Sequence, residues 1–183
     1  MKIVKGWFVT MAALVIGSGM FCVSVTAPAA SLDSQATSAL SGLYAKYPKA
    51  KELSKSAKAI VVFPSITKAG LGIGGESGDG VMRVKGKTVG YYNNSGVSSG
   101  LQIGAQKYGY ALFLMNDKAV SALSANDGFE VGVGPSVVVM DEGKAKTMTT
   151  TTAKDDIYAF IFGQKGLMAG LGVQGNKITR LKD

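Results

Sequence analysis

The sequence predicts an α+β fold, in which an N-terminal helical hairpin packs on a glycine-rich antiparallel β-sheet that curls into a barrel or sandwich. Three observations predict it. Apolar residues between positions 31 and 58 recur every three or four residues, the period of an amphipathic helix. From position 59 onward the chain consists mainly of short apolar or alternating runs, which are typical of strands. The turns between these runs are too short for crossover helices, which favours antiparallel pairing.

The first 29 residues have the pattern of a secretory signal peptide. Lys2 and Lys5 precede the apolar run 7–25, and the small residues of "TAPAAS" follow it with the spacing that signal peptidase requires. A transmembrane anchor is the alternative, but the run contains glycine and serine and no stop-transfer charges follow it. We therefore expect residues 1–29 to be removed. Residues 30–183 would form a single domain in the periplasm, at the cell envelope or outside the cell.

The amino-acid composition limits the partners and the catalytic or metal sites that this chain can have. Without Lys2 and Lys5 the 20 basic residues fall to 18, against 12 acidic ones, and this positive charge favours anionic partners. An exported protein is not expected to meet nucleic acid, so phospholipid headgroups are the leading choice. The chain has no histidine, and its one cysteine, Cys22, lies in the signal segment. The common zinc and copper sites and the Ser-His and Cys-His dyads are therefore excluded. We expect no enzyme activity, catalytic residue, cofactor or metal.

Two helices are expected before the strands. Pro48 ends the first and can open the second, because proline fits only the first turn of a helix. The first carries one apolar stripe, formed by Leu32, Ala36, Leu40, Leu43 and Tyr47. The second has an apolar face formed by Ala50, Leu53 and Ala57. The stripe predicts that this hairpin covers an apolar surface, which is either the sheet or a membrane.

Strands are expected from "AIVVF" at position 59 to "KITRL" at position 177, among them "FEVGVG", "SVVVM", "AKTMTTTT", "IYAFIF" and "GLMAGLGV". One interruption, "NDKAVSALS", is helical, and Asn116 or Asp117 can cap its N-terminus. Turns are expected at "KGK" (85–87), "NNSG" (93–96), "DEG" (141–143) and "QGN" (174–176).

The segment "GLGIGG" at 70–75 has the G-x-G-x-x-G spacing of a dinucleotide-binding loop. Such a loop opens a helix, whereas the alternating run that follows this segment is typical of a strand. The same spacing occurs at 170–175, where only eight residues follow. We therefore interpret these glycines as one bare face of a strand, and Gly132 and Gly134 in the same way.

Lysines gather around the second predicted helix. Between positions 46 and 68 one acid, Glu52, stands against six candidate lipid-binding residues: Lys46, Lys49, Lys51, Lys55, Lys58 and Lys68. A possible second basic face is formed by Arg83, Lys85 and Lys87, which alternate along a predicted hairpin. The alternatives are a solvated helix face for the first group and protection of a sheet edge for the second.

Aromatic side chains at strand spacing would line an acyl-chain pocket or fill the core, and the core is the commoner use. The set is Tyr91, Tyr92, Tyr108, Tyr110, Phe113, Phe129, Tyr158, Phe160 and Phe162.

Four segments together carry a family resemblance: "AIVVFPSITKAGLGIGG", "GYYNNSGVSSGLQIGAQ", "LFLMNDKAVSALSANDGFEVGVGPSVVVMDEG" and "IYAFIFGQKGLMAGLGVQGNKITRL". From about Ala36 onward the chain resembles the lipid-binding SYLF-domain family, and most of all its bacterial, exported, single-domain members. The resemblance implies non-catalytic binding of anionic phospholipid, with phosphoinositide-like headgroups, through an amphipathic N-terminal helix and nearby basic residues. No segment corresponds to the SH3 or FYVE module of eukaryotic relatives, so their actin-patch roles are not expected. The alternative is a structural or protein-interaction component of the cell envelope, with an envelope protein as its partner and no lipid preference.

Overall fold

The computed structural model describes residues 29–125, 127–140, 154–165 and 175–182, and within them three helices and six strands. The predicted signal segment lies outside the described residues, apart from Ala29. In chain order the elements are α1 (Ala29–Lys46), α2 (Pro48–Ser56), β1 (Ala59–Val84), β2 (Lys87–Leu114), α3 (Asp117–Ser124), β3 (Phe129–Glu130), β4 (Val137–Met140), β5 (Ile157–Lys165) and β6 (Lys177–Arg180).

β1 and β2 form one long antiparallel ribbon that is closed by a two-residue turn. Lys85 and Gly86 make this turn with φ values of 50° and 82°. Positive φ at both positions matches the right-handed twist of the two strands. Pairing runs from Val84–Lys87 beside the turn to Ala59–Leu114 at the open end. The turn predicted at "KGK" is confirmed.

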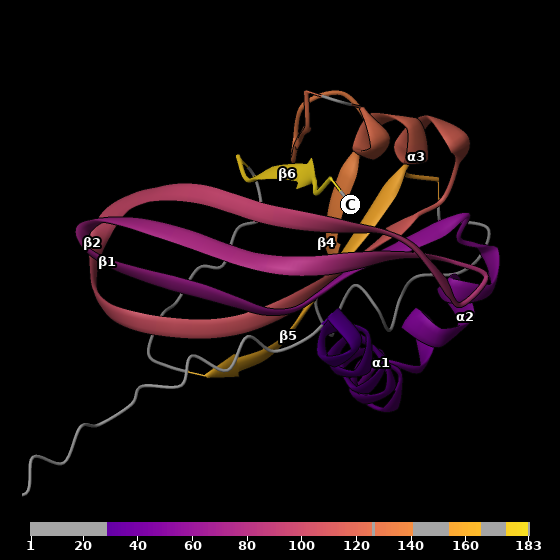
Figure 1. Ribbon diagram of the computed structural model, residues 1–183, viewed down its shortest axis with the longest axis horizontal. Coiled ribbons are helices and arrows are strands. Elements are labelled where there is room, and N and C mark those ends of the chain that lie inside the picture. The colour runs from indigo at the N-terminus through magenta and orange to yellow at the C-terminus, as the bar shows by residue number, and fades with distance from the viewer. Residues whose placement is uncertain (1–28, 126, 141–153, 166–174, 183) are drawn as a thin grey trace, which may run out of the picture.

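β2 organises the sheet, because three other strands pair with it. β6 pairs with residues 92–95 of β2, and β5 pairs with residues 107–114. The ribbon curves over itself between these two segments (Figure 1). Tyr110 Oη therefore reaches back to donate a hydrogen bond to Asn94 Oδ1 at 2.6 Å. The predicted fold class, a helical hairpin on a curled glycine-rich sheet, is confirmed.

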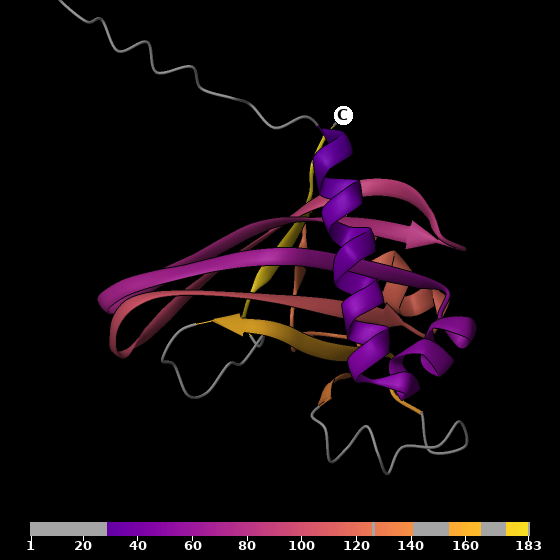
Figure 2. The ribbon, with the colours of Figure 1, turned by 90° about the horizontal axis from the view of Figure 1, so that it is seen from below.

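The helices cover opposite faces of the sheet (Figure 1). α1 crosses one face (Figure 2), where Leu40, Leu43 and Leu53 are buried against Phe113 and Phe160. α3 contributes Ala119 and Leu123 to a second apolar cluster, on the inner side of the curl. The apolar stripe of the first helix thus covers the sheet.

α3 is fixed by polar contacts at its N-terminus. Asn116 Oδ1 accepts a hydrogen bond from Ala119 N at 2.9 Å, which confirms the predicted cap. Asn116 Nδ2 donates to Asp156 Oδ1 at 2.6 Å, and Ser136 N donates to Asp156 Oδ2 at 2.9 Å. These bonds lower the pKa of Asp156 to about 2, so its carboxylate stays ionised and joins α3 to β4 and β5.

Three sequence expectations about strands and turns are wrong. "NNSG" is no turn, because β2 continues through Asn93 to Gly96 and pairs there with β1. "VGVG" is not a strand, since Gly132 and Gly134 have φ values of 101° and 91° and form a turn instead. β4 and β5 pair in parallel, because the 16 residues between them leave room for a crossover. "AKTMTTTT", "GLMAGLGV" and "DEG" lie outside the described residues.

Two glycines allow a matched test of backbone packing. A Cβ at Gly80 would lie 2.5 Å from both the Val62 carbonyl oxygen and Phe63 Cδ1, whereas one at Gly42, on α1, would meet nothing within 4 Å. We expect Gly80→Ala to lower the free energy of unfolding by about 2 kcal/mol through overpacking. Gly42→Ala should raise it by roughly 0.5–1 kcal/mol, since alanine favours a helix. Urea unfolding measures both, and equal effects would contradict the close approach at Gly80.

Candidate functional site

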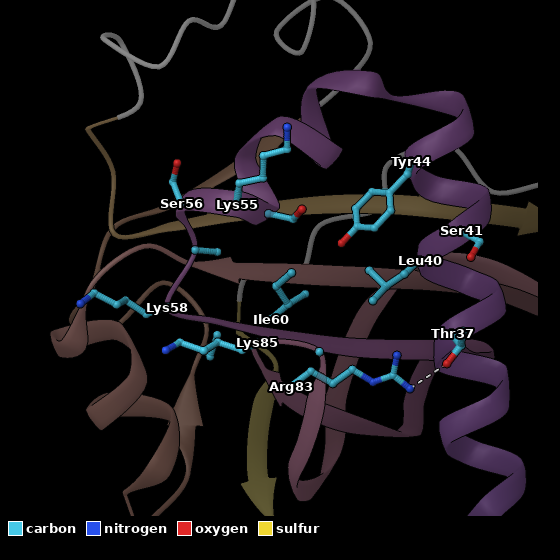
Figure 3. Close-up of a pocket in the computed structure, with 14 residues that line it drawn as sticks. Thr37, Leu40, Ser41, Tyr44, Lys55, Ser56, Lys58, Ile60, Arg83 and Lys85 are labelled. Carbon is cyan, nitrogen blue, oxygen red and sulfur yellow. Dashed lines mark hydrogen bonds between the residues drawn. The ribbon is translucent and has the colours of Figure 1, made fainter.

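A pocket of about 690 Å³ lies where the helical hairpin meets the start of β1 and the β1–β2 turn (Figure 3). α1 forms one wall with Thr37, Leu40, Ser41 and Tyr44. The end of α2 and the start of β1, residues 54–60, form the opposite wall. The β1–β2 turn closes the third side with Arg83, Lys85 and Gly86. The pocket therefore depends on the curl of the ribbon, which brings the turn back to the start of β1 and to α1.

Basic residues dominate the charge of this pocket. Lys55, Lys58, Arg83 and Lys85 line it, and none of its fourteen lining residues is acidic. Lys58 and Lys85 point the same way, away from Tyr44 (Figure 3). The nearest acid to Lys58 is Asp117, whose Oδ2 lies 3.8 Å from Lys58 Nζ, and both side chains are largely exposed. Such an exposed pair is weak, so the positive charge stays available to a ligand.

Hydroxyl groups and apolar side chains make up most of the remaining lining. Thr37, Ser41, Tyr44, Ser54 and Ser56 each bring a hydroxyl, and the apolar part consists of Leu40, Ala57, Ala59 and Ile60. Burial raises the pKa of Tyr44, so its hydroxyl stays neutral and can donate a hydrogen bond. This lining suits a ligand with anionic oxygens and hydroxyls at one end and carbon at the other.

Arg83 is held rigidly at the edge of the pocket. Its Nη2 donates to the Asp33 carbonyl oxygen at 2.8 Å and to Thr37 Oγ1 at 2.9 Å, and Asp33 Oδ1 lies 3.6 Å away. Its buried Nε has no hydrogen-bond partner among the described residues. A guanidinium fixed in this way presents a preorganised donor, the property that favours phosphate recognition.

The Asp33 carboxyl group makes the stability of this arrangement depend on pH. Its carboxylate accepts hydrogen bonds from Thr88 and Tyr91, and the Thr88 bond is the main reason why the pKa of Asp33 lies below its ordinary value of 3.8. The resulting stabilisation is complete above about pH 4 and is lost as the pH falls through the lower folded-state pKa. Asp33→Asn should therefore show a smaller loss of stability than the wild type between about pH 5 and pH 2.

Urea unfolding at several pH values measures this difference. Asp127→Asn, which changes an exposed carboxyl group, serves as the control and should keep the wild-type dependence. Equal pH dependence of Asp33→Asn and the wild type would refute the role of Asp33.

The structure brings together part of the predicted basic residues. Lys55 and Lys58 of the first group and Arg83 and Lys85 of the second line one pocket, which the sequence did not reveal. The predicted common face of Arg83, Lys85 and Lys87 is not formed, because Lys85 lies in the turn and Arg83 contacts α1. Lys87 is exposed outside the lining.

The other four lysines lie outside the pocket. Lys51 is exposed, Lys46 lies 5.2 Å from the centre of the Tyr47 ring, and Lys49 pairs with Glu52 at 2.8 Å. Lys68 does not share this surface at all. It is only 5% exposed and lies inside the curl of the sheet, beside Glu76.

Most of the aromatic residues fill the core, as expected for their spacing. Buried members are Tyr92, Tyr108, Tyr110, Phe113, Phe129, Tyr158 and Phe160, while Tyr91 and Phe162 are partly buried. The hydroxyl groups of the pocket were missed, because short polar residues such as Thr37 and Ser54 carry no sequence signal of their own.

No helix within the described residues is long and apolar enough to span a membrane.

Part of the chain matches a known protein family. The family model described as Ysc84, Las17-binding protein actin regulator, matches residues 95–183. No curated protein matches the chain. The matched part comprises most of β2, α3 and the later strands, whereas all residues lining the basic pocket lie between positions 37 and 86. The pocket therefore has to be judged on its own chemistry.

Proposed function

Because the chain belongs, through residues 95–183, to the SYLF-domain family, which is associated with lipid binding and actin regulation, we propose that it binds anionic phospholipid without catalysis. The observation that carries this proposal is the pocket between α1, α2 and the ribbon turn. Four basic residues and no acid are among its lining residues. Lys58 forms only a weak exposed pair with Asp117, and Arg83 is fixed by Asp33 and Thr37. A phosphate or phosphorylated polyol headgroup matches these donors.

Each part of the pocket has a defined role in this proposal. The Arg83 guanidinium contacts a phosphate oxygen, while Lys55, Lys58 and Lys85 attract the anionic bilayer surface. A lysine near such a surface contributes on the order of 1 kcal/mol, so three lysines give about 3 kcal/mol at low salt. Salt screens this attraction, which makes the association reversible.

α1 contributes to this site as a wall. Its apolar residues Leu40 and Leu43 are buried on the sheet, so binding at the pocket does not require them to enter the bilayer. This differs from the expectation that the amphipathic helix itself provides the contact. Under this proposal the hydroxyl groups of Thr37, Ser41 and Tyr44 on α1 face the headgroup.

The signal-like pattern of residues 1–29 places this activity outside the cytoplasm in our proposal, at the periplasmic side of an envelope membrane. The proposed ligand is then the phospholipid of that membrane, recognised by its negative charge. The phosphoinositide-like preference stays a prediction from the family resemblance.

Co-sedimentation of the protein with vesicles tests the proposal. We expect binding to vesicles that contain anionic phospholipid at about 50 mM salt, with a steep loss as the salt rises, and little binding to zwitterionic vesicles. Equal binding to both vesicle types would contradict headgroup recognition. Absence of binding to either type would favour the alternative, a protein-interaction component of the envelope. Exposed Ile73 and Val97, 74% and 84% exposed, are the apolar residues that such a partner would contact.

A further inference from the structure

A cluster of buried polar side chains lies inside the curl of the sheet, away from the basic pocket. Lys68, Glu76, Asn94, Gln106 and Asn176 are each at most 6% exposed. They come from β1, from both halves of β2 and from the residue before β6. The hydroxyl groups of Tyr108 and Tyr110 join them from the same inner face. The proposed phospholipid function uses none of these groups.

Part of the cluster is satisfied within the protein. Glu76 Oε1 accepts hydrogen bonds from Tyr108 Oη at 2.8 Å and from Asn176 Nδ2. Lys68 Nζ lies 3.7 Å from Glu76 Oε2, which balances the two buried charges but is too long for a hydrogen bond. Burial raises the pKa of Tyr108 and of Tyr110, so both hydroxyl groups keep their protons and act as donors.

Three atoms of the cluster have no partner among the described residues. They are Asn94 Nδ2 and both polar atoms of Gln106, Nε2 and Oε1. Gln106 lies directly opposite Lys68 in the β1–β2 register, so both buried residues belong to the same part of the ribbon. Roughly nine in ten buried polar groups in proteins have a partner, so three unpaired atoms in one cluster require an explanation.

A glycine keeps one wall of this cluster clear. A Cβ at Gly96 would meet the Asn176 side-chain oxygen and would lie 3.1 Å from Glu76 Cγ. Gly96 is paired with Glu76 across the ribbon. The close approach of Asn176 to Glu76 therefore depends on the absence of a side chain at this position.

We propose that this cluster binds small hydrogen-bonding molecules, which accept from the unpaired Asn94 and Gln106 amides and donate a hydroxyl hydrogen to Gln106 Oε1. Water has this chemistry, and buried water commonly makes about three such bonds. The hydroxyl group of a small polar solute has it too. Water and such a solute would form the same hydrogen bonds with these amides, so the experiment has to identify the bound molecule. This inference goes beyond the phospholipid function and does not depend on it.

The first measurement asks whether the wild-type protein holds a long-lived water molecule or a solute. Magnetic relaxation dispersion of the solvent, with cross-relaxation from water to the side-chain amide of Gln106, should detect a molecule that stays bound longer than the protein tumbles. Extraction of the denatured protein followed by mass spectrometry should detect a solute instead. Either result supports the site and identifies its source, whereas the absence of both signals overturns it.

A substitution then locates the site. Gln106→Leu should remove the molecule bound at this amide and lower the unfolding midpoint, because the hydrogen bonds to that molecule are lost. Thr67→Leu, at an exposed position next to Lys68, is the matched control and should leave the bound molecule in place. If Gln106→Leu raises the unfolding midpoint, Gln106 has no bound partner and the proposal is wrong, because removing an unpaired buried group is stabilising. If Gln106→Leu does not fold, the wild-type measurement still decides.

Discussion

Glu76→Leu is expected to lower the free energy of unfolding by about 3–5 kcal/mol, the range observed when one partner of a buried ion pair is removed. The carboxylate of Glu76 balances the charge of Lys68 at 3.7 Å and accepts from Tyr108 and Asn176. Leucine at this position would leave the ammonium group of Lys68 without a counter-charge in a site that is 5% exposed. It would also leave two hydrogen-bond donors unpaired.

A double-mutant cycle separates the charge from the packing. Lys68→Met in the Glu76→Leu background should recover much of the lost stability, because the buried charge then disappears as well. Glu130→Leu, at an exposed position on β3, is the control and should change the stability by no more than about 0.5 kcal/mol. Urea unfolding at neutral pH of the wild type, Glu76→Leu, Lys68→Met and the double variant completes the cycle, and Glu130→Leu is measured beside them. A loss under 1 kcal/mol for Glu76→Leu would mean that the Lys68–Glu76 pair is solvated.

The second large effect concerns the basic pocket. Lys58→Glu combined with Lys85→Glu should weaken binding to anionic vesicles at least about 100-fold at low salt. Each lysine contributes on the order of 1 kcal/mol, and reversal adds repulsion of similar size, so two reversals cost about 3–4 kcal/mol. Since 1.4 kcal/mol is a factor of ten, this loss exceeds 100-fold. Both side chains are on the pocket wall and point the same way (Figure 3).

A variant with the same charge change elsewhere tests whether the pocket matters. Lys51→Glu with Lys87→Glu changes the net charge equally, but neither residue lines the pocket. We expect this control to lose clearly less affinity than the Lys58 and Lys85 pair. Circular dichroism should show that both variants keep the fold. Equal losses in the two variants would assign binding to the overall charge of the surface, and the proposed pocket would be wrong.

The helical part of the fold could be predicted because its signals are local. The spacing of Leu40 and Leu43 gives the buried face of α1, and Pro48 opens α2. Asn116 caps α3 through a residue only three positions away. In the same way, the turn at "KGK" could be predicted because it depends only on the local backbone, in which Lys85 and Gly86 have positive φ.

The lengths of β1 and β2 could not be predicted, because glycine occurs in this chain both within strands and in turns. In "NNSG" and "GLGIGG" it permits a strand to continue while another part of the chain approaches, as Asn176 does at Gly96. In "VGVG" it supplies the positive φ of a turn. The sequence does not distinguish these uses, since the neighbour that decides between them is distant in the chain.

The candidate site was predicted only in part, for the same reason. Lysines around α2 were visible as a charge run, but the contribution of Lys85 depends on the curl of the ribbon, which brings the turn back toward Lys58 from the other end of β1. Lys68 was assigned to the same surface because charge implies exposure. Its even spacing from Glu76 puts both residues on one face of β1, but eight residues of an extended strand span about 26 Å. Only the curl of the ribbon brings the two charges to 3.7 Å, and the sequence carries no signal for where the ribbon curls.

The two-residue turn at Lys85 and Gly86 has a consequence for the order of folding. Apart from three register shifts, each pair in the β1–β2 ribbon follows from the one before it. The ribbon can therefore form by zippering outward from the turn with little loop-closure entropy at each step. β6 joins β2 only through a much longer loop, and Asn176 is 100 residues away from Glu76. We therefore expect the β1–β2 ribbon to form early in folding and the pairing of β6 with β2 to form late. The carboxylate of Glu76 should stay hydrated until β6 and Asn176 pack against the ribbon.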